Sequence, residues 1–349
     1  MSLLRRSARR ALQLSTPSLR HRRTFASRID IPFTPPPVPV IEKCPVPTCP
    51  CSAAPDGLQI EREQNINGSM AAYAEQVLLC TGRSDWASRI ETEENADGEI
   101  VRQLKSFLGP GGKFSDPYHN AMLTNSSIQS SASPTHQNER SSQTASTSRS
   151  IPAAKPGKDP SIAREQDAPA IPPASAFLLP SFYHDKLSRE QKKILKRQPE
   201  LQKQFIGARK INEILVLICG HGGRDERCGK LGPILQKEFE DKLQRQNIAL
   251  LHDAPVAEAE EVNTDVEGYV PTARTGLISH IGGHKWAGNV IVYIPPSFAS
   301  NPLAGKGIWY GRVGPEHVEG IVAKTIMDGK VIKELFRGGI DQNREIIRL

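Results

Sequence analysis

The sequence predicts an α/β fold in which a thioredoxin-like domain at the C-terminus follows a smaller α/β domain. Two observations lead to this prediction. Short apolar runs alternate with segments of helical spacing along residues 70–183 and 211–338. The second segment is expected to run strand, helix, a series of strands and helix, an order that suits a small α/β sandwich of the thioredoxin type.

Length and composition are those of a globular protein. The chain has 349 residues, enough for about two domains. Its 38% hydrophobic and 24% charged residues are ordinary values for a soluble protein. No apolar run approaches the roughly 18–20 residues that cross a membrane. We therefore expect no membrane span.

Residues 1–25 have the composition of a mitochondrial transit peptide. Eight Arg precede the first acidic residue, Asp30, and LLRRSARRALQL can form a helix with Leu on one face and Arg on another. We expect the import machinery to bind this segment and cleavage to follow Phe25, which favours the mitochondrial matrix. If the segment is cleaved off, most of the net charge of +7 is removed with it. Nucleic-acid binding, the usual alternative for a basic end, is therefore not expected.

Residues 26–69 form a Pro-rich stretch that we expect to be an extended, flexible lead-in. Cys44, Cys49 and Cys51 fall inside it. In a reducing compartment, clustered Cys residues suggest metal binding or redox chemistry rather than structural disulfides. Their spacing matches no strong zinc pattern, however, and solvated thiols on a flexible segment are the favoured interpretation.

The smaller N-terminal domain is expected over residues 70–183. Apolar runs predict strands at 74–80, 119–127 and 175–182, and helices are expected to begin at 86 and to span 98–109. Residues 125–173 are rich in Ser, Thr, Gln, Asn and Pro, which predicts a disordered insertion. Cys80 ends the first apolar run and is expected to be a core residue.

A polar helical linker, 184–210, is expected to lead to the C-terminal domain at 211–338, with 339–349 as a tail. The predicted strands are 213–219, 248–253, 276–281, 289–294 and 308–313, and the predicted helices are 232–246 and 315–327. Pro near the start of each helix suits its first turn. The segment from Cys219 to Gly229 is expected to be a loop.

Four potential metal ligands lie at the ends of these predicted elements. Cys219 closes a strand and Cys228 follows it, whereas His280 and His284 flank a Gly-Gly pair. The Cys-x8-Cys spacing is wider than the usual x2–4 of a zinc site and suits a loop that wraps one iron. Two thiolates and two imidazoles together predict a 2Fe–2S cluster. Its potential would lie toward the Rieske range of roughly −150 to +300 mV, with proton uptake coupled to reduction.

Each candidate ligand also has a structural interpretation. A lone Cys at a strand end is commonly a core residue, and a His pair at this spacing is often incidental. The convergence of all four at loop ends favours ligation. Around them we expect His221 to be a competing ligand, Arg224 and Asp225 to pair, Trp286 to shield the site from water, and His252 and His317 to be structural.

Three motifs, CGHGGRDERCG, HIGGHKWAGNVIVY and WYGRVGPEHVEGIV, resemble the sucrase/ferredoxin-like family. The stretches LLCTGRSDWASRIE and AFLLPSF are similar to its first half, so the resemblance covers 70–125 and 174–338. It implies a thioredoxin-like ferredoxin domain whose 2Fe–2S ligands fall on Cys219, Cys228, His280 and His284. It also implies redox chemistry rather than sucrose hydrolysis, and the sequence contains no carboxylate pair in a recognisable glycosidase context.

The leading functional hypothesis is a mitochondrial electron-transfer protein that serves an unidentified redox partner. An electron carrier is favoured over an enzyme that turns over a substrate. One alternative is a structural Cys2His2 zinc module, against which the Cys spacing argues. Another is a thiol–disulfide oxidoreductase that uses Cys80 or the cysteines of the lead-in. It ranks last because no Cys-x-x-Cys stands at a strand end.

Overall fold

A mixed sheet runs through the computed structural model, which describes residues 35–130, 175–181, 209–255 and 269–349. The predicted transit peptide, most of the Ser-rich insertion and nearly all of the helical linker lie outside these ranges. The strand order is β12-β11-β9-β8-β5-β7-β3-β2-β4, and β6 also pairs with β7. The strands are β2 (Glu75–Cys80), β3 (Ala121–Ser126), β4 (Ser175–Leu179), β5 (Ile214–Cys219), β6 (Ala249–Leu250), β7 (Thr272–Ile278), β8 (Val290–Ile294), β9 (Lys306–Tyr310), β11 (Phe336–Asp341) and β12 (Ile346–Ile347). The α/β class is confirmed.

Strand β5 is the centre of this sheet. It pairs in parallel with β7 and antiparallel with β8. Every one of its residues is buried, as the continuous apolar run predicts for a strand covered on both faces. Ile214, Val216 and Ile218 enter one hydrophobic core, whereas Leu215, Leu217 and Cys219 enter the other. Alternation along β5 therefore places Cys219 in the second core.

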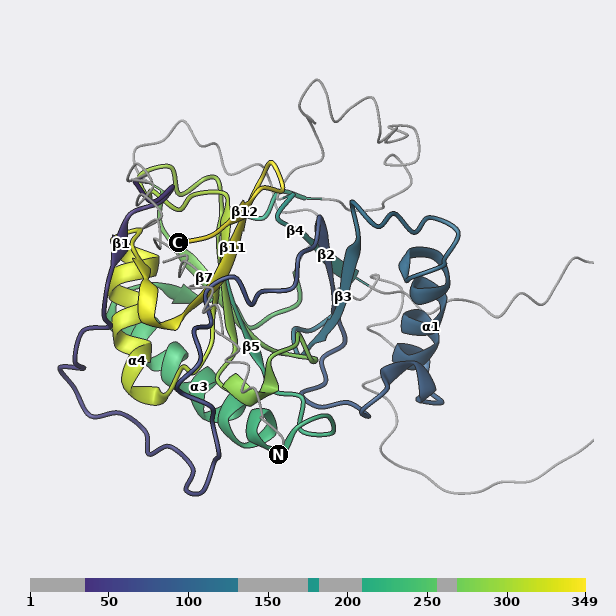
Figure 1. The fold of residues 1–349 in the computed structure, drawn as a ribbon, viewed down its shortest axis with the longest axis horizontal. Coiled ribbons are helices and arrows are strands. Elements are labelled where there is room, and N and C mark those ends of the chain that lie inside the picture. The colour runs from purple at the N-terminus through teal and green to yellow at the C-terminus, as the bar shows by residue number, and fades with distance from the viewer. Residues whose placement is uncertain (1–34, 131–174, 182–208, 256–268) are drawn as a thin grey trace, which may run out of the picture. The chain divides into compact units, whose positions relative to one another are not determined.

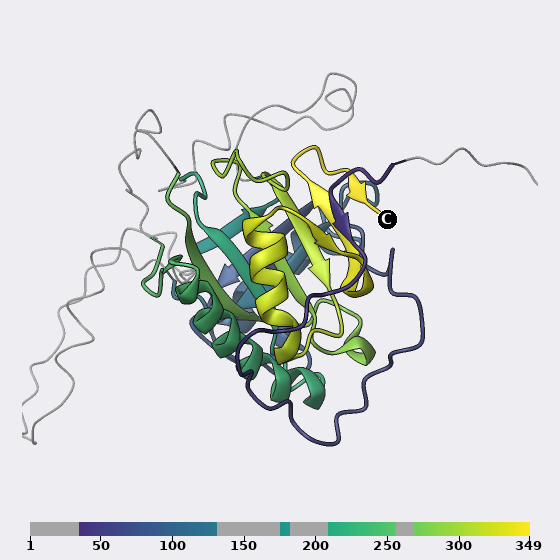
Figure 2. The same cartoon turned by 90° about the vertical axis from the view of Figure 1, so that its left-hand side faces the viewer.

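Two helices cover one face of the sheet in Figure 2, α3 (Glu226–Arg245) and α4 (Pro315–Gly320). The α4 segment continues as the π-helical turn η5 (Ile321–Met327). Helix α3 begins at Glu226 rather than at the predicted residue 232, because the Asp225 side chain accepts a hydrogen bond from the Arg227 amide and caps the new start. Pro233 therefore lies inside the helix. The buried stripe of Leu235, Phe239 and Leu243 holds the helix against the core despite that Pro.

The N-terminal strands join the same sheet as the C-terminal ones. Strand β2 runs parallel to β3 and antiparallel to β4, so the predicted strands near 74–80, 119–127 and 175–182 all belong to that sheet. Strands β3 and β7 meet through a single pair, Ser126 with Ile278. Main-chain pairing between the two predicted segments is thus short, but they also share one hydrophobic core and the buried hydrogen bond between Tyr73 and Tyr293 at 2.6 Å.

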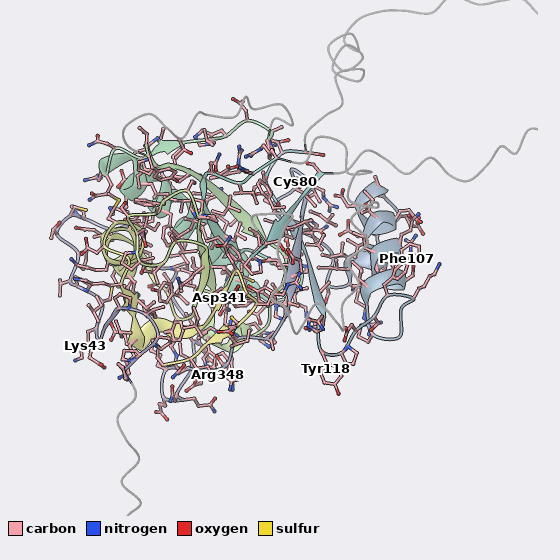
Figure 3. The ribbon with its side chains drawn as sticks, turned by 90° about the horizontal axis from the view of Figure 1, so that it is seen from above. Lys43, Cys80, Phe107, Tyr118, Asp341 and Arg348 are labelled. Atoms are coloured by element: carbon pink, nitrogen blue, oxygen red, sulfur yellow. The ribbon has the colours of Figure 1, made fainter. Side chains whose placement is uncertain are left out.

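Helix α1 (Ala96–Leu108) confirms the predicted helix at 98–109. The helix expected from residue 86 is wrong: only a short 3-10 turn, η1 (Ile90–Thr92), forms there. The Glu93 carboxylate accepts hydrogen bonds from the Ala87 amide and the Arg83 side chain. These bonds hold the chain between residues 83 and 93 in a loop instead of a helix. Figure 3 shows Phe107 of α1 and Tyr118, two exposed rings, at this side of the molecule.

Residues 36–69, which we call the strap, follow the helical face of the sheet (Figures 1 and 2). Its strand β1 (Val40–Ile41) pairs in parallel with β10 (Val331–Ile332). Val38 is buried in the core that α3 and α4 share. The sequence predicts this stretch as a flexible lead-in; in the structure it is held by main-chain pairing and by one apolar anchor.

At the other end of the chain, β11 crosses the predicted domain boundary at 338 and pairs with β9 and with β12. The residues predicted as a tail therefore contribute to the sheet. Among the described residues, no helix is long and apolar enough to cross a membrane.

Candidate metal centre

The four predicted ligands come together at one edge of the sheet. Strands β5 and β7 are parallel, so their carboxyl ends lie side by side. Cys219 is the last residue of β5, and His280 follows β7. Cys228 lies in the first turn of α3, not in the loop that the sequence predicts, and His284 opens the short turn η4 (His284–Trp286).

The two cysteines form a buried thiol pair. Cys219 is 2% exposed and Cys228 is fully buried. A hydrogen bond from the Cys228 thiol holds the pKa of Cys219 well below its usual value despite burial, and the His280 side chain adds to this effect. The same hydrogen bond and burial raise the pKa of Cys228. The two thiols are therefore in hydrogen-bond contact, and Cys219 is the one that loses its proton more readily.

The two histidines form an imidazole pair on the solvent side of the thiols. Their ring centroids are 5.3 Å apart, and His280 also contacts Cys219. His280 is half-buried and His284 is exposed. Gly282 and Gly283 have positive φ of 82° and 74°, a conformation that lets the chain turn between the two rings.

Within the described ranges, no three His, Cys, Asp or Glu side chains are grouped so that they could hold one metal ion. The site consists instead of two neighbouring donor pairs, one of sulfur and one of nitrogen.

His221, the competing ligand candidate, is engaged by the protein through both ring nitrogens. Its Nδ1 accepts the His280 amide proton at 3.0 Å, which leaves Nε2 to donate to the Trp86 and Ala87 carbonyls, each at 3.0 Å. The ring is 2% exposed. His221 thus fixes the backbone of His280 and has no lone pair left for a metal.

Arg337 is a buried cation beside the centre that sequence reasoning missed. Its guanidinium donates to Asn289 Oδ1 at 2.6 Å, to the Gly282 carbonyl at 3.2 Å and to the Ser69 carbonyl at 2.9 Å. Asn289 in turn donates to the Gly283 carbonyl, and its own carbonyl accepts the Cys219 amide proton. Asn289 therefore connects the glycine turn between the two histidines to the end of β5. Arg337 holds both Asn289 and that turn in place.

The positive charge of Arg337 also suits the two sulfurs and two imidazoles beside it. Burial lowers its pKa to about 10, and both Cys219 and Cys228 act against that lowering because their sulfurs are close enough to attract the cation. Soft thiolates and imidazoles with a fixed positive charge beside them fit an iron–sulfur group better than a hard oxygen-liganded cation. The only sequence signal for Arg337 is a charge inside the strand-like run FRGGID.

The predicted supporting residues are partly rearranged. Arg224 does not pair with Asp225; it donates to Ser88, and Asp225 forms an ion pair with Arg227 at 2.8 Å. Trp286 lies under the Arg337 guanidinium, 5.3 Å from ring centroid to carbon, and donates to Glu61 of the strap at 2.7 Å. Trp286 therefore covers Arg337.

The cap of α3 sets the position of Cys228. We expect Asp225→Ala to lower the free energy of unfolding by about 1 kcal/mol, because the first turn loses its capping carboxylate. Chemical denaturation measures this change. Glu226→Ala is the matched control, since Glu226 is an exposed carboxylate of the same first turn that pairs with Lys230; an equal loss in both variants would contradict the capping role.

The remaining candidates lie away from the centre. Cys80 is a buried core thiol, as expected, and burial raises its pKa to about 11. The Nδ1 of His317 accepts the Gly314 amide proton at 2.9 Å at the start of α4, which confirms its structural role. His252 is exposed beside β6.

The chain is thus an α/β protein in which a buried thiol pair and an imidazole pair lie near the carboxyl ends of two central strands. The chain belongs to the sucrase/ferredoxin-like family, whose model matches residues 66–338. Curated relatives named "Altered inheritance of mitochondria protein 32" are similar to it. The relative from Debaryomyces hansenii is 30% identical over 328 residues, which cover 86% of this chain and 96% of the relative.

Two further relatives of the same name match a shorter region more closely. The protein of Meyerozyma guilliermondii is 40% identical over 131 residues, 38% of this chain and 36% of the relative. That of Clavispora lusitaniae is 44% identical over 131 residues, 37% of this chain and 36% of the relative. These two alignments thus span about a third of the relatives' length. No solved structure matches the chain.

Proposed function

We propose that this protein is an electron carrier with a 2Fe–2S cluster held by Cys219, Cys228, His280 and His284. The observation that carries the proposal is the pairing of donors: two sulfurs in contact inside the protein and two imidazoles beside them. Two-iron clusters with mixed ligation take two protein ligands on each iron, sulfur on one and nitrogen on the other. Bound there, the cluster would accept and release one electron.

The donor arrangement favours two irons over one zinc. A structural zinc site needs four ligands around a single ion. The described residues contain no group of three such ligands around one point, whereas they do contain two pairs. The zinc module therefore has less support than the cluster.

The chain's own residues would set how electrons reach the centre. The thiol side is enclosed in the core, and Arg337 places a fixed positive charge there. The imidazole side reaches solvent at His284. We infer that a redox partner docks over His280 and His284. When the cluster gains or loses an electron, an imidazole nitrogen would take up or release the accompanying proton.

A thioredoxin-like C-terminal unit is also proposed. Its support is the order β7-β5-β8-β9, with β5 parallel to β7 and antiparallel to β8, and with α3 after β5 and α4 after β9. The sequence predicts the succession of a strand, a helix, further strands and a helix along the chain, but not the order of the strands in the sheet.

We further propose that the protein acts in mitochondria, with residues 1–25 as the import signal and the matrix as its compartment. The Arg-rich, acid-free composition of that segment supports this, as does the printed name of the relatives. N-terminal sequencing of protein recovered from mitochondria is expected to begin at Ala26. An unprocessed chain outside the organelle would contradict the assignment.

Purification without oxygen tests the proposed cofactor. We expect about two irons and two acid-labile sulfides per chain and a coloured protein. One equivalent of zinc, with no iron or sulfide retained after reconstitution with both, would contradict the proposal and favour the zinc module. The reconstitution step is needed because a cluster with an exposed imidazole side is readily lost in air.

A further inference from the structure

Residues 48–52 of the strap, Thr-Cys-Pro-Cys-Ser, are fixed at both ends to helices far away in the sequence. The Thr48 amide and hydroxyl donate to the Glu319 carboxylate of α4 at 2.9 Å and 2.5 Å. The Ser52 amide and hydroxyl donate to Glu238 of α3 at 3.1 Å and 2.7 Å. This Cys-Pro-Cys segment is therefore held in a defined conformation across α3 and α4.

Cys49 lies between an anion and a cation. Its thiol donates to Glu319 Oε2 at 3.1 Å. The ammonium of Lys242 interacts with the Cys49 sulfur and donates to the Pro50 carbonyl at 3.4 Å. Lys242 is itself buried, at 3% exposure, whereas Cys49 is half-buried and reaches solvent. A partly exposed sulfur beside a fixed ammonium is the usual environment of a reactive cysteine.

Cys51 folds back toward Cys49. Its sulfur lies 3.6 Å from the Cys49 carbonyl oxygen, so its side chain points along the chain toward the other cysteine. The Cα atoms of residues two apart in sequence lie at most roughly 7 Å from one another, so a small bend at Pro50 would bring those of Cys49 and Cys51 into the disulfide range of about 4.4–6.8 Å. Both thiols are free in the structure.

We propose that Cys49 and Cys51 form a redox-active dithiol, separate from the metal centre, that glutathione disulfide or a similar low-molecular-weight disulfide oxidises reversibly. Cys49 loses its proton to solvent, and its thiolate attacks one sulfur of the glutathione disulfide. The S–S bond breaks, and one glutathione thiolate leaves and takes up a proton.

In the second step Cys51 loses its proton and attacks the Cys49 sulfur of the mixed disulfide, and the second glutathione leaves. The protein has then lost two electrons and two protons, and the oxidant has become two molecules of glutathione. Cys49 is assigned as the attacking thiol because its sulfur contacts the Lys242 ammonium. Cys51, which faces the Glu238 carboxylate, is the resolving thiol.

A disulfide between Cys49 and Cys51 would close a small ring, and a small ring strains the bond. Strained disulfides are readily reduced. The product is therefore an exchangeable disulfide rather than a structural one. The third cysteine of the strap, Cys44, takes no part, because burial raises its pKa to about 12 and its sulfur donates to the His317 carbonyl.

The test uses the full chain incubated in buffers of varied glutathione to glutathione disulfide ratio, trapped by alkylation and digested with trypsin. The peptide 44–62 contains these three cysteines and no other. We expect this peptide to lose two hydrogens reversibly as the ratio falls, in the wild type and in Cys44→Ser. We expect Cys51→Ser to stop at a glutathione adduct on Cys49, and Cys49→Ser to lose the reaction.

A second measurement is the rate at which iodoacetamide alkylates Cys49. Glu319→Gln is expected to raise this rate severalfold, because it removes the negative partner and leaves the ammonium. A peptide that stays reduced at every ratio, or a disulfide that requires Cys44, would overturn the proposal. Since the readout is confined to one peptide, it does not depend on whether the metal centre is loaded.

Discussion

Replacing Cys228 with Ser is expected to leave the anaerobically purified protein without bound iron and sulfide, down from about two of each per chain. The hydroxyl of Ser is not a thiolate at neutral pH and does not ligate iron as sulfur does. Because Cys228 is fully buried and Ser has nearly its shape, the sheet and α3 are expected to remain folded. Iron and sulfide assays, with circular dichroism, measure both effects.

Cys80→Ser is the matched control for this substitution. Cys80 is a buried thiol of the same hydrophobic core, at 5% exposure, but it ends β2 and is not one of the four candidate ligands. We expect this variant to keep its full iron content. Equal loss of iron from both variants would point to a general weakening of the core, and full retention in Cys228→Ser would remove Cys228 from the ligand set.

The second large effect is expected at Arg337. Arg337→Met leaves the acceptors on Asn289, Gly282 and Ser69 without their donor. We expect the free energy of unfolding to fall by about 2–4 kcal/mol, because buried acceptors without a partner are costly. We also expect a lower midpoint potential, since the buried cation favours the more negative, reduced state of the centre.

Arg337→Lys separates these two contributions. It retains the positive charge but not the planar fork that reaches three acceptors. Stability is expected to fall while the midpoint potential stays near that of the wild type. Arg344→Met is the control for loss of a cation elsewhere, since Arg344 pairs with Glu75 away from the centre. A potential that does not differ between Arg337→Met and the wild type would contradict the electrostatic role.

The strands and the positions of Cys219, His280 and His284 at strand ends or turns could be predicted because their signals are local. The apolar run of β5 has one physical outcome, a strand covered on both faces, and it places Cys219 at its end. The Gly-Gly pair likewise marks the turn between His280 and His284. The apolar runs at 74–80 and 175–182 likewise predicted β2 and β4 as strands, but not their pairing.

The first turn of α3 could not be predicted, because Glu226, Arg227 and Lys230 give it no apolar face. Its start depends on the Asp225 cap and on close packing at Gly229, where a Cβ would lie 2.5 Å from the Gly222 Cα. The observed helix start matters for the site, because it places Cys228 in the first turn of α3 and not in the predicted loop.

The strap and Arg337 were missed for a different reason. Their partners are distant in the sequence: Glu319 and Glu238 hold Thr48 and Ser52, and Arg337 reaches Ser69. A Pro-rich segment shows no periodicity that would reveal such anchors. Long-range hydrogen bonds to single carboxylates or carbonyls leave no pattern in the sequence around them.

Pulsed EPR of the dithionite-reduced protein, grown with ¹⁵N-labelled histidine, tests ligation by His280 and His284. We expect strong hyperfine coupling to two imidazole nitrogens, with one coupling lost in His280→Ala and one in His284→Ala. The His221→Ala variant is expected to keep both, because His221 holds the backbone of His280 rather than a metal. A reduced signal without nitrogen coupling, or one whose couplings survive in both ligand variants, would contradict ligation by His280 and His284.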